Sequence, residues 1–333
     1  MKLEPMSPEE GVNRYFDDRN ELSAKTKQNY RYQLKEFTKW CDKRNITNLN
    51  ELTGKKIQEF KRWRMDLVKP ATVKNNMWTV KTFMQFCEHI NAVPEGVHRK
   101  VRIPTLNYED EVKDDKLTQK EAKLIKAHLE KYEYATVRHV IFTILWSTGV
   151  RSGTLHGLDR GDFNPTKGTL AIRHRPETDT PLKNKERAER KIAISDDTIE
   201  VIRDYLTYTH SGGTDEYGRV PLIMGRGTRP SKATIQRNIY TVTRPCHYMN
   251  LCPHDRDPQT CEATSYSTAS KCPSSVGPHA LRKGYVTASL NAEQPKDVTA
   301  ERVNMSREVL DKHYDKRTED EKMEQRRQHL KEI

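Results

Sequence analysis

The sequence lacks several features that mark common protein classes. No apolar run approaches the length of a membrane span, and the N-terminal stretch MKLEPMSPEE has no apolar core of the kind a signal peptide carries. No GxxxxGK[ST] loop is present, so no motif points to nucleotide hydrolysis. Internal repeats and low-complexity tracts are also missing. We therefore expect a cytoplasmic globular protein without a membrane partner.

Cysteine is too sparse for a disulfide framework. Six cysteines in 333 residues favour thiols or metal ligands in a chain without a signal peptide. Four of them fall in one Pro- and Ser-rich segment, CHYMNLCPHDRDPQTCEATSYSTASKC (246–272). Zinc takes four Cys or His ligands, which makes a structural zinc site one interpretation, with the ligands Cys246, Cys252, Cys261 and Cys272. The segment has no CxxC pair, so four free thiols are the alternative.

Basic residues outnumber acidic ones. Lys and Arg total 59 against 47 Asp and Glu, a net charge of +12. This excess favours a polyanionic partner, because each neutralised phosphate releases condensed counterions. The length is sufficient for two domains with separate cores.

Apolar periodicity predicts helices over the first part of the chain, residues 1–98. One helix after Pro70 places Val73, Met77, Val80, Met84 and Cys87 on one face. Its opposite face would present a polar row with flanking lysines: Thr72, Lys74, Asn75, Asn76, Thr79 and Lys81. Short polar side chains near bases and lysines near phosphates would suit a DNA groove. A plainly solvated helix face is the alternative.

Residues 99–116 show no period and mix both charges, which is typical of a linker. Residues 117–333 then form a second domain of mixed pattern. A helix ending near Gly149 is followed by a predicted hairpin, with strands over 169–175 and 190–194. The fold class is therefore mainly α with a small antiparallel β-sheet.

Four separated pieces of the second domain carry reactive or phosphate-binding side chains. STGVRSGTLHGL contains Arg151, and PLKNKERAERKIAI is a lysine-rich hairpin edge. PHALRKGYVT places His279 and Arg282 three residues apart on one helical face, and HYDKR contains Tyr314. Each piece alone is a weak signal, but their order and spacing are informative.

These pieces resemble the tyrosine recombinase family, the phage-type integrases and their cellular relatives. The resemblance implies a helical, SAM-like core DNA-binding domain (1–98) that clamps DNA, followed by a mixed α/β catalytic domain (117–333) with a Cys-rich insertion at 246–272. It also implies roles for three kinds of side chain: Arg151 and Arg282 would hold the scissile phosphate, His279 would assist proton transfer, and Tyr314 would be the nucleophile. On this interpretation Tyr314 is exposed so that DNA can reach it.

The same resemblance places a catalytic lysine in the hairpin. Lys183 is nearest the family position, and Lys185 is the alternative on the same segment. Lys185 and Arg187 are also candidate DNA contacts.

The chemistry of these residues is consistent with that assignment. A phenol with a pKa near 10 attacks a phosphodiester only with help from the site. Arginines can stabilise the charge of the pentavalent state, and a lysine can protonate the departing 5′ oxygen. A 3′-phosphotyrosine link conserves bond energy, so catalysis would need neither a nucleotide nor a metal cofactor.

Two positions depart from the family pattern. Met305 stands nine residues before Tyr314, where many relatives have His or Trp, and a thioether is no strong hydrogen-bond donor. Thr154 replaces an acidic residue that often supports the first arginine.

The resemblance implies an integrase of a virus or other mobile element, an archaeal virus included. Its partners would be double-stranded DNA attachment sites, bound by a homotetramer on two sites, with an accessory DNA-bending or directionality protein. A type IB topoisomerase and a non-catalytic DNA-binding protein are the alternative functions. Supercoil relaxation without site preference would indicate the first, and loss of cleavage with intact binding the second.

Overall fold

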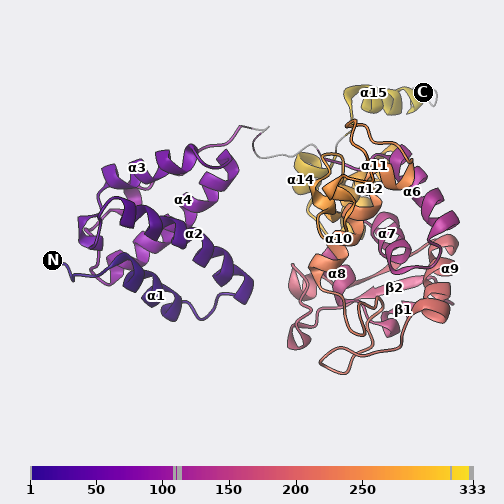
Figure 1. The fold of residues 1–333 in the computed structure, drawn as a ribbon, viewed down its shortest axis with the longest axis horizontal. Coiled ribbons are helices and arrows are strands. Elements are labelled where there is room, and N and C mark those ends of the chain that lie inside the picture. The colour runs from indigo at the N-terminus through magenta and orange to yellow at the C-terminus, as the bar shows by residue number, and fades with distance from the viewer. Residues whose placement is uncertain (1, 108–109, 111–114, 316, 330–333) are drawn as a thin grey trace. The chain divides into compact units, whose positions relative to one another are not determined.

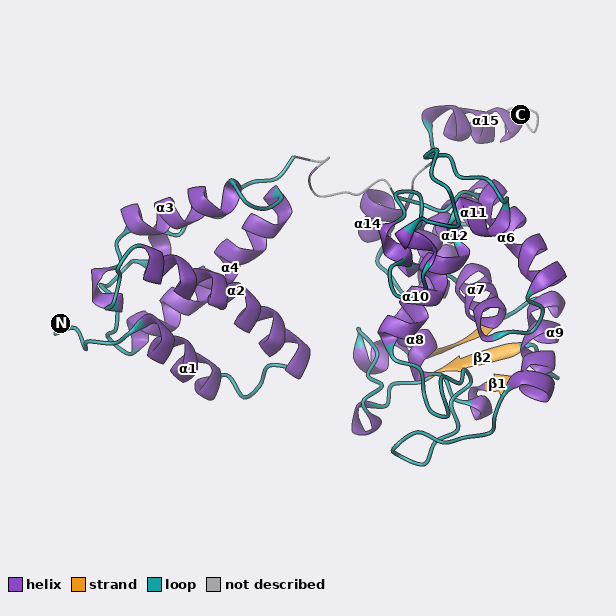
Figure 2. Ribbon diagram, viewed as in Figure 1, coloured by secondary structure: helices purple, strands orange, loops and turns teal. Residues whose placement is uncertain are grey.

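The computed structural model describes residues 2–107, 110, 115–315 and 317–329. The chain forms two compact units, Met1–Lys113 and Asp114–Ile333. Helices dominate both units, and the described strands form one small sheet in the second (Figure 2), as the sequence predicts. Of the predicted linker, residues 108–109 and 111–114 lie outside the described residues. No described helix has both the length and the apolar character needed to cross a membrane.

The first unit is a helical bundle (Figure 1). Its described α-helices are α1 (Pro8–Asp18), α2 (Ala24–Lys43), α3 (Gly54–Met65) and α4 (Pro70–His89). The hydroxyl of Ser7 caps α1 by accepting from the Glu10 N–H at 3.2 Å. The predicted apolar face of α4 is confirmed as buried, and it packs in a core that includes the rings of Phe37 and Phe60, 5.2 Å apart.

The predicted polar face of α4 is only partly exposed. Asn76 and Thr79 are each 2% exposed, so their placement on an open face is wrong. Arg64 of α3 donates to Asn76 Oδ1 at 2.8 Å, and Thr79 donates to Gln33 of α2. These partners come from neighbouring helices, and they satisfy polar groups that burial would otherwise penalise. Thr72, Lys74, Asn75 and Lys81 keep at least partial exposure.

The second unit begins with α6 (Gln119–Tyr132), α7 (Val137–Thr148) and α8 (Ser152–Gly157). The sheet follows, with β1 (Phe163–Asn164), β2 (Thr169–Ile172) and β3 (Arg190–Ala193). After it come α9 (Asp196–Asp204), a π-helical turn (Tyr205–Thr209), α10 (Lys232–Val242) and α11 (Pro245–Tyr248). The last described helices are α12 (Pro278–Asn291), α13 (Lys296–Val303), α14 (Arg307–Val309), a π-helical turn (Leu310–Tyr314) and α15 (Glu319–His329).

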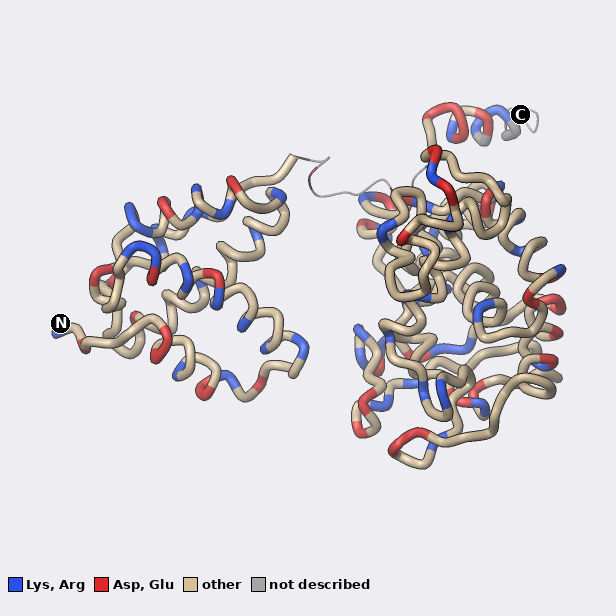
Figure 3. The backbone as a smooth tube through the Cα atoms, in the orientation of Figure 1, with Lys and Arg blue, Asp and Glu red and all other residues tan. Residues whose placement is uncertain are grey.

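The predicted hairpin is confirmed, because β2 and β3 pair antiparallel with Leu170 opposite Ile192. Helix α7 is apolar on nearly every side and packs against α9, α10 and α12 (Figure 1). It ends at Gly149, whose left-handed φ of 61° turns the chain toward α8. In α15, acidic residues occupy the first turn and basic residues follow (Figure 3).

The chain enters the second unit directly against α12. The backbone N–H of Leu117 donates to the carbonyl of Ala280 at 3.1 Å. Lys283 Nζ lies 2.8 Å from Asp115 Oδ1. Gly284 allows this approach, since a Cβ there would lie 2.0 Å from the Leu117 carbonyl oxygen. This entry contact therefore depends on a residue without a side chain in the middle of a helix.

Replacing Gly284 with alanine should destabilise the protein, although alanine is the better helix former. The added Cβ would also lie 2.8 Å from the Trp146 ring, so backbone or ring must shift, at a cost of about 1–3 kcal/mol. Urea unfolding measures this change. Gly153→Ala in α8 is the control, because its Cβ would meet only Lys232 Cε at 3.9 Å. Equal stability of both variants would contradict the prediction.

Candidate active site

A cleft of about 590 Å³ in the second unit collects residues from four separate parts of the chain. It is lined by the start of α8, the segment before β3, α10 and the beginning of α12. Four of the five predicted catalytic residues line it: Arg151, Lys183, His279 and Arg282. The fifth, Tyr314, contacts His279. The structure thus brings together all five.

Tyr314 and His279 form the central pair of this site. Tyr314 Oη lies 2.9 Å from His279 Nε2, and the Arg282 guanidinium carbon lies 5.3 Å from the centre of the Tyr314 ring. The expectation that Tyr314 is exposed is wrong, since it is only 5% exposed. Its ring packs in a small core, which consists of Val286, Leu290, Ala300, Val303 and Leu310. Four of those residues come from α12 and α13, and Leu310 comes from the π-helical turn that also contains Tyr314.

The environment of His279 keeps its imidazole neutral near pH 7. Burial, together with the nearby Arg282 and Lys283 charges, lowers the pKa of His279 to about 4. A neutral ring has one nitrogen that accepts. The phenolic O–H of Tyr314 can therefore donate to His279 Nε2, the arrangement of a nucleophile with its general base.

Arg282 is almost completely buried yet incompletely hydrogen-bonded. It is 1% exposed, and its Nη1 donates to the Gly149 carbonyl at 2.6 Å. Among the described residues, its Nε and Nη2 have no hydrogen-bond partner. Burial, with Arg151 nearby, lowers the pKa of Arg282 to about 10. Two buried N–H donors without acceptors form a ready cradle for the oxygens of an anion.

Two further arginines add positive charge to this cluster. Burial lowers the pKa of Arg151, whose Nη1 donates to the Asn304 carbonyl at 3.2 Å. Burial and Arg151 lower the pKa of Arg190 to about 10. No described carboxylate pairs with either residue or with Arg282. The sequence analysis missed Arg190, because the first residue of a returning strand carries no signal that it faces two other arginines.

The lysine segment is held in place by one asparagine. Lys183 is exposed and lines the cleft, whereas Lys185 and Arg187 do not line it. Asn304 joins this segment to Arg151, whose side chain donates to its carbonyl. On the side of the segment, Asn304 Oδ1 accepts from Asn184 Nδ2 at 2.6 Å, and Asn304 Nδ2 donates to the Arg187 carbonyl at 3.2 Å. The left-handed φ of Asn304, 53°, suits asparagine.

The two departures from the family pattern have different surroundings. Met305 is partly buried and packs against the apolar cluster that holds Tyr314. Thr154 lines the cleft, and its backbone N–H donates to the Arg151 carbonyl at 2.9 Å. The hydrogen bond from Arg151 Nη1 to the Asn304 carbonyl thus holds the side chain of the first arginine.

The four cysteines of the insertion, all partly buried and unpaired by disulfides, line one cavity. Burial raises the pKa of Cys246, and Cys252 and Cys272 add to that effect. A tighter group lies nearby: His128, Glu133 and His247 are the one set of three or more described ligand side chains whose atoms all lie within 4.8 Å of each other. Arg138 already binds Glu133 there, with 3.2 Å between Nη1 and Oε2.

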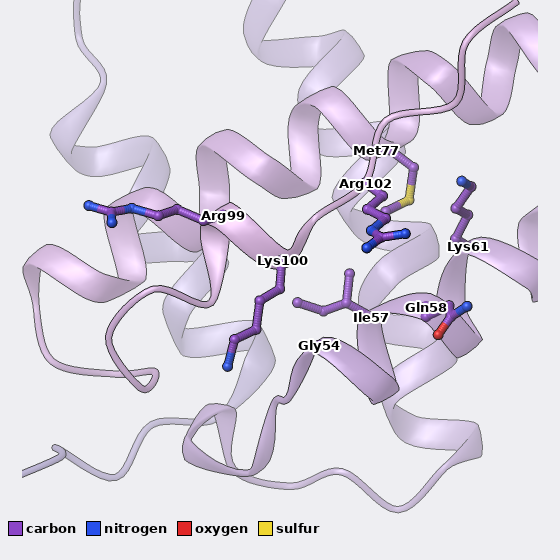
Figure 4. A pocket seen from close by; sticks show the side chains of 8 residues that line it. All are labelled: Gly54, Ile57, Gln58, Lys61, Met77, Arg99, Lys100 and Arg102. Carbon is purple, nitrogen blue, oxygen red and sulfur yellow. The ribbon is translucent and has the colours of Figure 1, made fainter.

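The first unit has a basic cleft of about 560 Å³. Gly54, Ile57, Gln58 and Lys61 of α3 and Met77 of α4 line it together with three basic residues after α4: Arg99, Lys100 and Arg102. Lys100 and Arg102 extend on different sides of Ile57, and Arg99 points away from them (Figure 4). The apolar floor and the surrounding cations suit a phosphate backbone.

Comparisons with known proteins identify the first unit. Residues 13–90 match the model of the phage integrase N-terminal SAM-like domain. The N-terminal domain of a phage integrase/site-specific recombinase from Haloarcula marismortui is 34% identical over 30% of this chain and 99% of that chain, with a TM-score of 0.30. No curated protein matches the sequence.

Solved structures resemble the whole chain. An integrase of the Tn1549 transposon, in complex with a circular intermediate DNA, has a TM-score of 0.68 at 13% identity, covering 98% of this chain and 100% of that chain. A lambda integrase dimer bound to a COC′ core site has a TM-score of 0.66 at 15% identity, covering 93% of this chain and 77% of that chain. At these identities the likeness concerns the fold.

The buried, neutral state of His279 predicts a pH dependence of stability. The folded imidazole has a pKa of about 4, below its ordinary 6.5, so the unfolded state binds more protons between these values. The contribution of the neutral His279 to the free energy of unfolding is fully present above pH 6.5 and is lost as pH falls toward 4. Urea unfolding of the wild type and of His279→Gln between pH 7 and 4.5 measures it, with the wild type losing more stability. Parallel profiles would contradict the prediction.

Proposed function

We propose that this chain, whose residues 13–90 match the phage integrase SAM-like domain, is a tyrosine recombinase. In this proposal it cleaves and rejoins duplex DNA at specific sites through a 3′-phosphotyrosine intermediate. The observation that carries the proposal is the pairing of Tyr314 Oη with His279 Nε2 at 2.9 Å, beside the buried guanidinium of Arg282.

In the cleavage step, Tyr314 Oη attacks the scissile phosphorus and its proton passes to His279. The bond from phosphorus to the 5′ oxygen breaks, leaving a 3′-phosphotyrosine and a free 5′ hydroxyl. Rejoining reverses these steps, with the 5′ hydroxyl as the nucleophile and the phenol as the leaving group. The phosphodiester energy is conserved, so the reaction balances without nucleotide hydrolysis.

Arg282 and Arg151 take the non-bridging oxygens of that phosphate. The two N–H groups of Arg282 without a described partner supply hydrogen bonds that the folded protein leaves unmade. A phosphate in this position would also relieve the mutual repulsion among Arg151, Arg190 and Arg282. Because charge accumulates on phosphorus oxygens in the transition state, these contacts strengthen as the reaction proceeds.

Lys183 is the proposed general acid for the departing 5′ oxygen. Its position in the lining of the cleft favours it over Lys185. Asn304 binds this segment through its side chain and Arg151 through its backbone carbonyl, so one residue links the acid to the phosphate clamp. Lys185 and Arg187, exposed on the same segment, are proposed DNA contacts.

The reaction as proposed uses no catalytic cofactor, since nucleophile, base, acid and oxyanion donors all come from the chain. Any zinc bound by the cysteines of the insertion would have a structural role.

DNA recognition is assigned to the first domain. Two surfaces offer polar and cationic contacts. One is the exposed part of α4, with Thr72, Lys74, Asn75 and Lys81. The other is the basic cleft that Arg99, Lys100 and Arg102 line. The lambda integrase is known as a tetramer bound to a Holliday junction. We extend that assembly to this chain: a homotetramer on two attachment sites of a virus or mobile element, assisted by an accessory protein and located with cytoplasmic DNA.

Replacing Tyr314 with phenylalanine should abolish the covalent intermediate while DNA binding persists. Nicked duplexes carrying candidate attachment junctions trap the intermediate, because cleavage releases a short strand that cannot religate. Denaturing electrophoresis then detects DNA-linked protein. Tyr208→Phe is the matched control, since that ring is 82% exposed and does not line the cleft.

A covalent band that survives Tyr314→Phe would exclude Tyr314 as the nucleophile. Tight DNA binding by the wild type without any covalent band would indicate a protein that only binds DNA. Relaxation of supercoiled plasmids without site preference would instead indicate a topoisomerase.

Charge reversal at Arg102 should weaken DNA binding with little effect of DNA sequence. Loss of one phosphate contact should reduce the slope of log affinity against log salt by about 1. Fluorescence anisotropy at several salt concentrations measures both quantities for Arg102→Glu. Lys25→Glu, an exposed lysine at the start of α2, is the control for net charge. Equal losses in the two variants would remove the basic cleft from the DNA interface.

A further inference from the structure

The cysteine-rich insertion brings distant thiols to one point. Cys246, Cys252, Cys261 and Cys272 are separated by six, nine and eleven residues, yet all four line one cavity of about 10 Å³. That volume is about the space of a single water-sized sphere. A space of this size, lined by four cysteines, matches an ion better than an organic ligand.

The insertion has little else to hold it together. Between the end of α11 at Tyr248 and Pro278 the buried apolar residues are Ala263 and Ala269 alone, and the regular structure there is limited to the 3-10 turns Glu262–Thr264 and Ala269–Lys271. Two alanines bury too little surface to offset the entropy of ordering a loop of this length. A cross-link through its four cysteines would supply the missing stabilisation.

The charge around the cavity suits a thiolate centre. Four thiolates around a divalent ion carry a net charge of about −2. Arg244 and Arg256 both line the cavity. Arg244 is 6% exposed and is fixed there, because its Nη1 donates to the Ala263 carbonyl at 2.5 Å. All-sulfur donor sets select zinc and similar thiophilic ions over magnesium or calcium.

The insertion ends at the first turn of α12, which carries His279. Ser275 Oγ donates to the Cys272 carbonyl at 3.0 Å. Thr243 Oγ1, just after α10, accepts from the Val276 N–H at 3.0 Å. Cys246 follows α10 by four residues, and Cys272 precedes Pro278 by six. A bond between these two cysteines through one ion would therefore fix the start of α12 against the end of α10.

We propose that Cys246, Cys252, Cys261 and Cys272 bind one zinc-class metal ion, and that this ion positions the first turn of α12 and hence His279. Among the described residues, no three of these sulfur atoms lie within 4.8 Å of one another. Tetrahedral coordination at about 2.3 Å draws the sulfurs closer than that, so metal binding contracts the loop. The effect on His279 rests on the proposed recombinase function, whereas the metal site itself does not.

The first experiment measures metal in the full-length protein, purified without a polyhistidine tag, by elemental mass spectrometry. The expected content is about one zinc per chain. Replacement by Co²⁺ should give the thiolate-to-cobalt absorption of a tetrahedral sulfur site. Metal-free protein with four reactive thiols, or with two disulfides in place of them, would overturn the proposal.

Variants separate this site from the nearby histidine group. Cys252→Ser and Cys261→Ser should each lower zinc content at least about tenfold. His128→Ala, which removes a ligand from the His128, Glu133 and His247 group, should leave it unchanged. Loss of zinc in His128→Ala with retention in both cysteine variants would assign the metal to the other group and overturn the proposal. The wild-type measurements stand even where a cysteine variant fails to fold.

The positioning role is tested by removing the ion from the wild type with a chelator and restoring it with Zn²⁺. Metal-free protein should melt at a lower temperature and cleave nicked DNA at least about tenfold more slowly, with unchanged DNA affinity. Both properties should recover with Zn²⁺. Tyr314→Phe should bind the same amount of zinc as the wild type. Zinc content therefore tests the metal site independently of cleavage. A cleavage rate indifferent to zinc would overturn the positioning role.

Discussion

The burial of unpaired arginine charge is the constraint on which the candidate site depends. Arg151, Arg190 and Arg282 are desolvated close to one another, and no described carboxylate neutralises them. Such burial is costly, and the surrounding core must offset it. The carbonyls of Gly149 and Asn304 satisfy only part of the guanidinium donors. The folded protein thus holds buried positive charge that a phosphate would neutralise. Burial, with Arg282 and Arg151 close by, also keeps His279 neutral.

Sequence reasoning succeeded where the signal is local. The apolar stripe of α4 repeats at helical spacing, and the end of α7 is set by Gly149, whose conformation is left-handed. The hairpin of β2 and β3 follows from two separate β-prone runs. The candidate active-site residues came instead from their order along the chain, which the family resemblance supplied, and the structure brings them to one cleft.

Sequence reasoning failed where partners come from distant elements. Tyr314 lies in a charged local sequence, but all of its buried apolar neighbours except Leu310 belong to α12 and α13. Asn76 and Thr79 lie on the polar side of α4, and only the positions of Arg64 and Gln33 on other helices explain their burial. The spacing of apolar residues along one helix identifies its most apolar face. It does not reveal whether neighbouring helices also bury the other faces.

The entry of the chain into the second unit has a mechanical consequence. Leu117 is hydrogen-bonded to the turn of α12 between His279 and Arg282, and Asp115 pairs with Lys283 one residue later. Tension applied at Asp115 would therefore load the helix that carries both side chains first. Under the proposed function, such a pull would change the spacing between the general base and the phosphate clamp.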